Sequence, residues 1–214
     1  MIQDPSLSDI SAALKPVFTE EEIALLDSQT SLARDLFGRR YLPGFVGLNN
    51  LKKTDYINAT LQSLAHVKPL RDFFLRCGSG HTFQLKLRTS SVSSSSSFSS
   101  SKKRKRGAIK SKVKLITVDP LSFSHLAQCF GELIRKMWSN KRFKSTVDPH
   151  MLIQAVSVAS KKKFTIGRQA EAGEFMSWIL HQLHIGVGGT GKPGSSVIHS
   201  IFQVRIFYCC YCSC

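Results

Sequence analysis

The stretch GFVGLNNLKKTDYINATLQ, residues 44 to 62, decides the fold of this chain. From Asp55 onward, the apolar residues Ile57, Leu61 and Leu64 recur at helical spacing, which predicts a helix with one apolar face. Aspartate is favoured as a cap or first-turn residue, so Asp55 is a suitable start for that helix.

The same stretch resembles the nucleophile box of the ubiquitin-specific proteases, which reads GLxNxGNTCYxNAxLQ. The matching positions are Gly47, Leu48, Asn50, Thr54, Tyr56, Asn58, Ala59, Leu61 and Gln62. Asp55 stands where the box has its cysteine. A cysteine in the first turn of a helix ionises to an attacking thiolate, whereas an aspartate is a weak, strongly solvated oxygen base. The resemblance therefore implies a box without its nucleophile, and no catalytic residue is expected.

Two further departures lie just before Asp55. The Gly-Asn pair of the family box is replaced by Lys52 and Lys53, which should crowd the cleft and make it positive. Asn50 stands five residues before Asp55, where the family has its oxyanion-stabilising side chain. Without a nucleophile and a base, a single donor is no catalytic site, and Asn50 is alternatively a turn cap.

A second stretch, QAEAGEF at residues 169 to 175, resembles the second protease box, QxDAxEF. The segments YLPGFVGLNN, PLRDFFL, FGELIRKMW, SKKKFTI and FMSWILHQLH also resemble the catalytically inactive, spliceosomal branch of the family, whose box likewise carries an aspartate. The resemblance implies an α+β papain-like fold of which only the mainly helical, thumb-like portion is present. It implies a non-catalytic scaffold in nuclear pre-mRNA splicing that binds proteins of the tri-snRNP, with no cofactor.

Two other functions stay open. A deubiquitinase fragment would need another thiol, but Cys77 and Cys129 lie in the wrong helical contexts, and Cys129 is expected to be buried and inert. None of the seven histidines has the context of a base followed by an orienting acid or amide. His181 and His184 are expected to be surface or packing residues, so no metal site is predicted. A non-catalytic ubiquitin-binding module, making a weak ubiquitin contact, is the second alternative.

The chain divides into five predicted parts. A helical connector, residues 1 to 40, has a short helix near Ser8 to Leu14 and a longer one over 19 to 37, opened by the capping box of Thr19 and Glu22. Residues 41 to 77 begin the protease-like domain, 78 to 118 form a disordered insertion, and 119 to 207 complete the helical portion. Residues 208 to 214 form a cysteine-rich tail.

Within the later part, the apolar spacing of residues 126 to 137 predicts a helix, and Asp148 with Pro149 predicts the start of the next. A further helix is predicted from Ala172 to Ile185, with Phe175, Ile179 and Leu183 on its inner face. Residues 198 to 207 alternate loosely, as in a strand.

The insertion carries ten serines between Ser90 and Ser101, followed by a basic run. It cannot bury enough apolar surface to fold. The run itself consists of Lys102, Lys103, Arg104, Lys105 and Arg106. It is interpreted first as a nuclear-import signal, which would place the protein in the nucleus; a direct nucleic-acid contact and a solvated loop remain open.

Half of the formal net charge of +16 lies in residues 102 to 114, which carry eight cations and no acid. The N-terminal residues lack the pattern of a secretory signal, and no apolar run approaches the roughly 18 residues needed to span a bilayer, so a soluble intracellular protein without membrane contact is expected. Four of the six cysteines crowd the final CCYCSC. Their spacing does not suit tetrahedral zinc, and an atypical terminus is the favoured interpretation.

Overall fold

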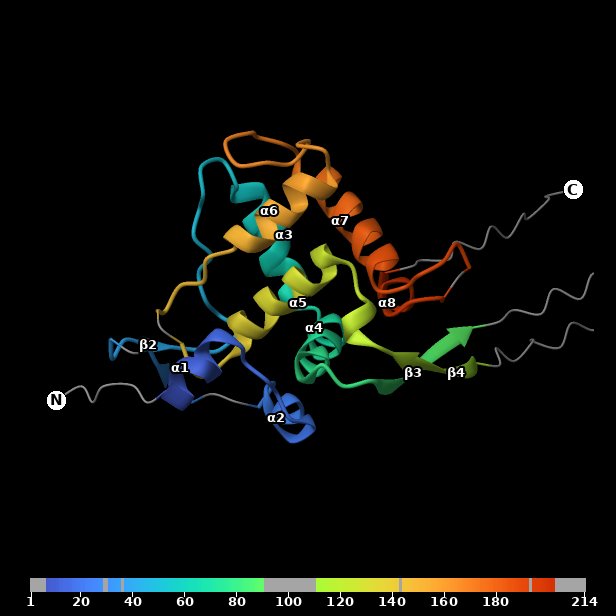
Figure 1. Ribbon diagram of the computed structural model, residues 1–214, viewed down its shortest axis with the longest axis horizontal. Coiled ribbons are helices and arrows are strands. Elements are labelled where there is room, and N and C mark those ends of the chain that lie inside the picture. Colours follow the sequence, from blue (N-terminus) through green and yellow to red (C-terminus); the bar gives the residue numbers. More distant parts are fainter. Residues whose placement is uncertain are drawn as a thin grey trace, which may run out of the picture.

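The structure is a computed structural model, which describes residues 7–28, 31–35, 37–90, 111–142, 144–192 and 194–202. Its elements, in chain order, are α1 (Leu7–Leu14), α2 (Glu20–Leu25), β1 (Ala33–Arg34), β2 (Arg40–Tyr41), α3 (Asp55–Ala65), α4 (Lys68–Arg76), the 3-10 turn η1 (Cys77–Ser79), β3 (Phe83–Ser90), β4 (Ser111–Val118), the 3-10 turn η2 (Pro120–Ser122), α5 (His125–Trp138), α6 (His150–Ala159), α7 (Ala172–Gly186) and α8 (Val197–Phe202). Together these elements form a helical body with strands at its margins (Figure 1).

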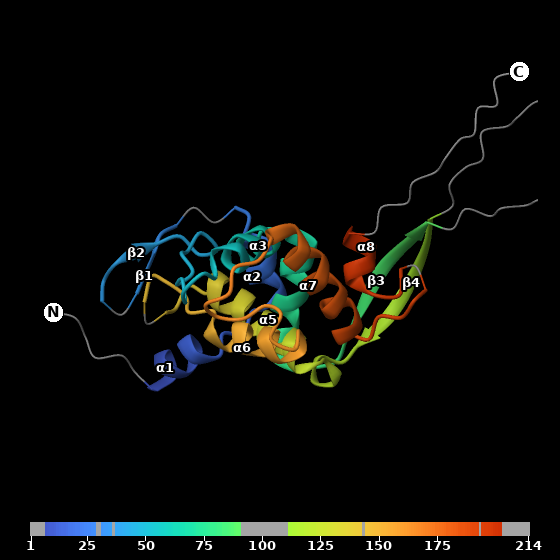
Figure 2. The same ribbon diagram turned by 90° about the horizontal axis from the view of Figure 1, so that it is seen from above.

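Helix α5 is the centre of the body, because α4, α6 and α7 all pack against it. Its predicted apolar face is confirmed: Phe130, Ile134 and Met137 are fully buried. Phe130 meets Phe74 of α4 edge to face at 4.9 Å between ring centroids. Helix α3 packs on α4 and α7, so the segment with the degenerate box is built into the same core (Figures 1 and 2).

The connector is only partly helical. The capping box is confirmed, since the Thr19 hydroxyl accepts from the Glu22 backbone and the Glu22 carboxylate accepts from the Thr19 backbone. The helix over 19 to 37 is wrong beyond Leu25, because the chain turns and β1 pairs with β2. The Asp35 carboxylate accepts from the backbone N–H groups of Phe37 and Arg39, at 3.0 and 2.8 Å, which closes that tight turn.

Ion pairs attach the connector to the body. The buried guanidinium of Arg71 on α4 donates to Asp27 at 2.7 Å and to Asp72 at 2.8 Å. It also lies 4.4 Å from the ring centroid of Trp138, at the end of α5. These contacts hold the pKa of the Asp27 carboxyl at about 2, chiefly through the hydrogen bond from Arg71.

The predicted disorder over 78 to 118 is wrong at both ends of that range. Strands β3 and β4 pair antiparallel, with Phe83 opposite Val118 and Leu85 opposite Ile116 (Figure 2). Phe83, Leu85, Ile116 and Val118 lie on one face of this pair, and Phe83 meets Phe73 of α4 at 6.2 Å between ring centroids. Residues 91 to 110, with the basic run Lys102 to Arg106, lie outside the described residues.

The predicted strand over 198 to 207 is also wrong in its described part, because Val197–Phe202 is helix α8. The Ser196 hydroxyl accepts from the His199 backbone at 3.3 Å, as a cap does, and Val197 and Ile198 are buried. Residues 203 to 214, including the cysteine-rich tail, lie outside the described part.

Helix α6 begins one residue later than predicted, with Pro149 as its cap. In the described part of the chain, no helix is long and apolar enough to cross a membrane.

Candidate functional site

Asp55 is the first residue of α3, as the sequence predicts, and its side chain is exposed. A carboxylate there is stabilised by the positive end of the helix dipole. Within the described residues, it accepts one side-chain hydrogen bond, from the amide Nε2 of Gln169 at 3.2 Å. The structure therefore brings the two sequence boxes together, with a carboxylate and an amide at the point of contact.

Asn50 acts in the turn before α3. Its side-chain oxygen accepts from the Thr54 backbone at 3.3 Å and from the Thr54 hydroxyl at 3.1 Å. That hydroxyl in turn accepts from the Leu51 backbone at 2.9 Å. Of the two interpretations of Asn50, the turn cap describes its contacts in this structure.

Lys52 and Lys53 both have left-handed backbones, with φ of 70° and 52°. This region favours glycine, and next asparagine, because a Cβ crowds the backbone there. The loop therefore keeps a conformation suited to the family's Gly-Asn pair while carrying two lysines. The Lys52 carbonyl accepts from the backbone of Gly167 at 2.9 Å, which links this loop to the loop between α6 and α7.

An aromatic cluster supports the start of α3. Tyr56 lies 6.3 Å from Phe164 and 5.7 Å from Phe175, and the last two lie 5.2 Å apart, all between ring centroids. Phe164 and Phe175 are fully buried. Burial raises the pKa of the Tyr56 phenol, so this hydroxyl stays protonated at neutral pH. The cluster fixes the position of Asp55 and supplies no reactive group.

The two described thiols, of Cys77 and Cys129, are free and buried. Burial raises the pKa of Cys77 to about 12, and its Sγ donates to the Phe73 carbonyl at 3.2 Å. Burial also raises the pKa of Cys129, on the inner side of α5. The thiolate is the nucleophilic form of cysteine, and burial disfavours it at both positions.

The paired histidines of α7 have separate environments. His181 is exposed, whereas His184 is buried, with Nδ1 2.7 Å from the Ser196 hydroxyl and its ring stacked on His199 at 3.5 Å between centroids. Burial, and next the proximity of His199, lower the pKa of His184. Among the described residues, no group of three His, Cys, Asp or Glu side chains could hold a metal ion.

Comparison with known proteins identifies the same family as the two sequence boxes. The family model described as ubiquitin carboxyl-terminal hydrolase matches residues 46–213. The chain belongs to the ubiquitin carboxyl-terminal hydrolase family. Ubiquitin carboxyl-terminal hydrolase 39 of Homo sapiens is 40% identical over 209 residues, which cover 96% of this chain and 31% of that protein.

One further relative and one solved structure of similar fold carry splicing in their names. The probable mRNA-splicing protein ubp10 of Schizosaccharomyces pombe is 36% identical over 211 residues, covering 96% of this chain and 34% of that protein. The crystal structure of an essential yeast splicing factor superposes with a TM-score of 0.56 at 18% identity, over 85% of this chain and 34% of that one. The predicted α+β fold of the family is thus confirmed, and the chain spans about a third of the length of these relatives.

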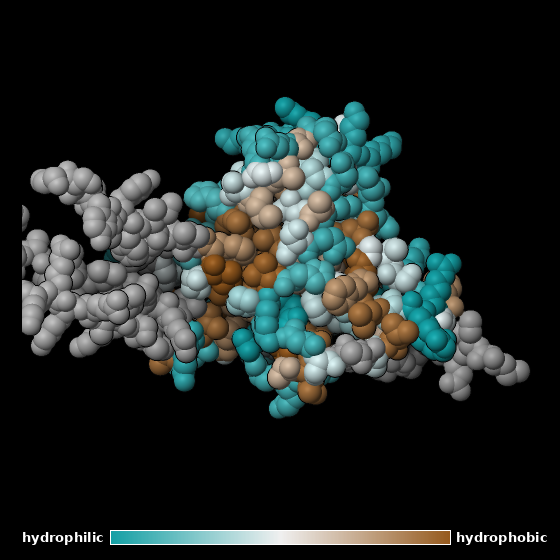
Figure 3. All heavy atoms as spheres, turned by 180° about the vertical axis from the view of Figure 1, so that it is seen from behind, coloured by the Kyte–Doolittle hydropathy of each residue, from teal (hydrophilic) through white to brown (hydrophobic). Residues whose placement is uncertain are grey.

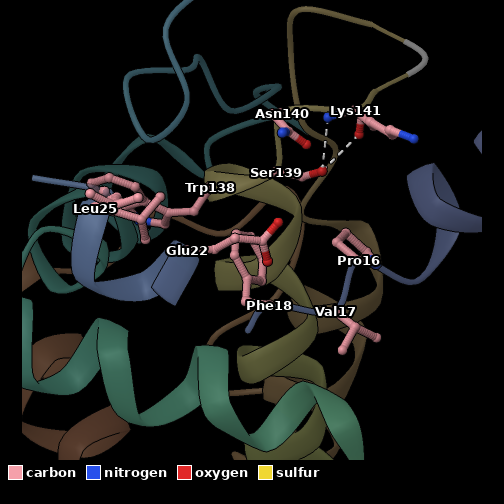
Figure 4. A pocket seen from close by; sticks show the side chains of 10 residues that line it. Pro16, Val17, Phe18, Glu22, Leu25, Trp138, Ser139, Asn140 and Lys141 are labelled. Atoms are coloured by element: carbon pink, nitrogen blue, oxygen red, sulfur yellow. Dashed lines mark hydrogen bonds between the residues drawn. The ribbon is translucent and has the colours of Figure 1, made fainter. Parts of the chain in front are cut away.

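A cavity of about 390 Å³ lies between the connector and the end of α5, and none of its lining residues belongs to either family box. Figure 4 shows Phe18 and Glu22 from the connector beside Ser139 at the end of α5. Glu22 is engaged by the Thr19 backbone, and Ser139 exchanges hydrogen bonds with the Lys141 backbone at 2.8 and 3.1 Å. These polar groups of the cavity wall are therefore used within their own segments, Glu22 in the connector and Ser139 at the end of α5.

Sequence reasoning missed several residues beside this family box. It did not foresee that Gln169 contacts Asp55, nor that Lys161, Lys162 and Arg168 lie in the loop that bonds to Lys52. The three consecutive lysines after α6 were the available signal. Their proximity to α3 depends on packing between segments more than a hundred residues apart.

Proposed function

We propose that this chain is a pseudoenzyme of its family and acts as a non-catalytic protein scaffold in nuclear pre-mRNA splicing. The observation that carries the proposal is the exposed Asp55 at the first turn of α3, where a cysteine protease of this family needs its thiol. A carboxylate cannot take over thiol chemistry. In this interpretation, the surface around the former cleft serves for docking.

The splicing role is supported by relatives whose names state it. They include the probable mRNA-splicing protein of Schizosaccharomyces pombe and, as a fold neighbour, the essential yeast splicing factor. By the family resemblance, the partners are proteins of the tri-snRNP. The location is the nucleus, reached through the basic run of residues 102 to 106.

A hydrolysis assay tests the pseudoenzyme part of the proposal. The parent chain should release no fluorophore from a ubiquitin C-terminal reporter, and Asp55→Cys should not restore release, because a thiolate also needs a base. Cys77→Ser and Cys129→Ser test whether another thiol serves as nucleophile. Turnover by the parent that Cys77→Ser or Cys129→Ser abolishes would overturn the assignment.

Purification tests the scaffold part. The tagged chain, recovered from nuclear extract, should bring down tri-snRNP proteins, whereas titration with ubiquitin should show no saturable binding. Saturable ubiquitin binding without splicing proteins would instead identify a ubiquitin-binding module.

A further inference from the structure

The loop before α3 and the loop between α6 and α7 form one basic surface. Its cationic residues are Lys52, Lys53, Lys161, Lys162, Lys163 and Arg168, and all are exposed. The acids among them are Asp55, Glu171 and Glu174, so six cations face three acids. This end of the molecule lies at the top in Figure 1, and the face seen in Figure 3 is hydrophilic there.

Direct contacts hold the two loops side by side. The Lys52 carbonyl accepts from the Gly167 backbone at 2.9 Å, and the Asp55 carboxylate accepts from Gln169 at 3.2 Å. Below them, Tyr56 of α3 packs against Phe164 of the second loop at 6.3 Å. The basic surface is therefore a fixed feature of the folded chain.

The backbone at this surface is costly for lysine. The described residues other than glycine with a left-handed backbone are Lys52, Lys53, Lys161 and Lys162, with φ of 70°, 52°, 51° and 64°. Glycine or asparagine would relieve each position. Residues held in such conformations cluster at functional sites, where the side chain has a use that outweighs the strain.

Electrostatics within the fold account for only one of the two lysine pairs. Lys161 and Lys162 follow the C-terminus of α6, where cations are favourable. Lys52 and Lys53 precede the N-terminus of α3, where the helix dipole is positive and a cation is unfavourable. Two of the acids are already engaged, because Glu174 pairs with Lys163 at 2.5 Å and Asp55 is bonded to Gln169.

We propose that this surface, the basic face of the degenerate box, binds the sugar–phosphate backbone of RNA. Its cations are mainly lysines, which bind phosphates as point charges without a fixed geometry. The aromatic rings beneath it, Phe164 and Phe175, are buried, so no base stacks there and binding is independent of sequence. The choice of RNA over other polyanions rests on the proposed splicing function.

The test removes the charges without adding strain. The quadruple variant Lys52→Gly, Lys53→Gly, Lys161→Gly, Lys162→Gly loses four charges at positions that favour glycine, so it should unfold at the same temperature as the parent or higher. The matched control is Lys15→Gln, Lys86→Gln, Lys144→Gln, Lys192→Gln, which loses the same charge from exposed sites on other segments. All full-length chains carry alanine at residues 102 to 106, so that this run does not bind the probe. Should the glycine variant fold poorly, Lys52→Asn with Lys161→Asn replaces it.

The readout is the affinity for a short RNA duplex and for oligouridine across a salt series. The glycine variant should bind about tenfold more weakly, and its slope of log K against log salt should be shallower by about 3, since each phosphate contact contributes 0.7 to 0.9. The control should keep the parental slope. Parental RNA binding by the glycine variant, equal losses in the control, or no RNA binding by any chain would each overturn the inference.

Polyglutamate is measured alongside RNA, and loss of its binding alone would assign the face to an acidic protein. Recovery of tri-snRNP proteins from extract is scored separately. If the glycine variant recovers tri-snRNP proteins and also binds RNA as tightly as the parent, this inference fails and the proposed function stands. If the parent recovers none, the proposed function fails.

Discussion

The inner face and the N-terminus of α3 differ in burial and in chemistry. Ile57 and Leu61 on the inner face are fully buried, whereas Asp55, at the start of the same helix, is exposed. The inner face packs on α4 and α7 and so specifies the fold, while the first turn presents the group that decides reactivity. Because the two sets of residues do not overlap, a thiol can be exchanged for a carboxylate without loss of the fold.

The largest expected effect concerns the core side of this comparison. Phe175→Ala should lower the free energy of unfolding by about 3–5 kcal/mol, because it leaves a cavity between Tyr56 and Phe164. Urea unfolding measures it. Ile185→Ala on the same helix is the control, since Ile185 is 53% exposed and should cost little. Equal costs would mean that the aromatic cluster does not support α3.

The next effect concerns the first residue of the degenerate stretch. Gly44 has φ of +86°, and a Cβ there would lie 2.6 Å from the Trp138 ring, so Gly44→Ala should cost about 1–3 kcal/mol. Gly38→Ala is the matched control: φ is +78° but nothing lies within 4 Å, so only the backbone strain is felt. If the two variants unfold alike, the loop before α3 is not anchored on α5 by this contact.

The sequence predicts the inner face better than the site because periodicity is local. The buried sides of α3, α5 and α7 follow directly from apolar spacing. The same kind of spacing gave a wrong helix prediction over residues 19 to 37. Phe37 fits a helical pattern, yet it is 64% exposed, because the Asp35 carboxylate closes a turn there. Strands β3 and β4 were missed, since their apolar face exists only once two distant segments pair.

At the site, the sequence predicts that Asp55 begins a helix, but it does not predict which residues surround Asp55. The contact with Gln169 spans 114 residues of sequence, and the link from Lys52 to Gly167 depends on the same packing. Nor does a sequence give the sign of φ at Lys52, since lysine rarely adopts a left-handed backbone.

A pH titration extends the comparison to the other end of α7. The pKa of His184 is lowered in the folded state, so the unfolded chain binds more protons near the ordinary value of 6.5. The stability that comes from keeping His184 neutral is therefore fully present above pH 6.5, and it is lost as the pH falls below that value. Unfolding in urea on both sides of that value should show the loss, and His184→Gln should abolish this part of it.

The groups that face His184 are His199, His181, Ser196 and the Thr190 carbonyl. His181→Gln, at an exposed position, is the control and should keep most of the pH dependence. If this control removes as much of it as His184→Gln, the buried ring is not its source.

The smallest effect is expected at Asp55 itself. Asp55→Asn keeps an oxygen for the Gln169 amide but loses the charge that interacts with the α3 dipole, which is worth about 0.3–1 kcal/mol at an exposed site. Urea unfolding should therefore place this variant close to the parent and far from Phe175→Ala. Gln169→Ala should be equally mild, because it removes only the exposed partner of that bond. A cost at Asp55 approaching that of Phe175→Ala would show that the carboxylate is part of what specifies the fold, and the separation between the face and the end of α3 would not hold.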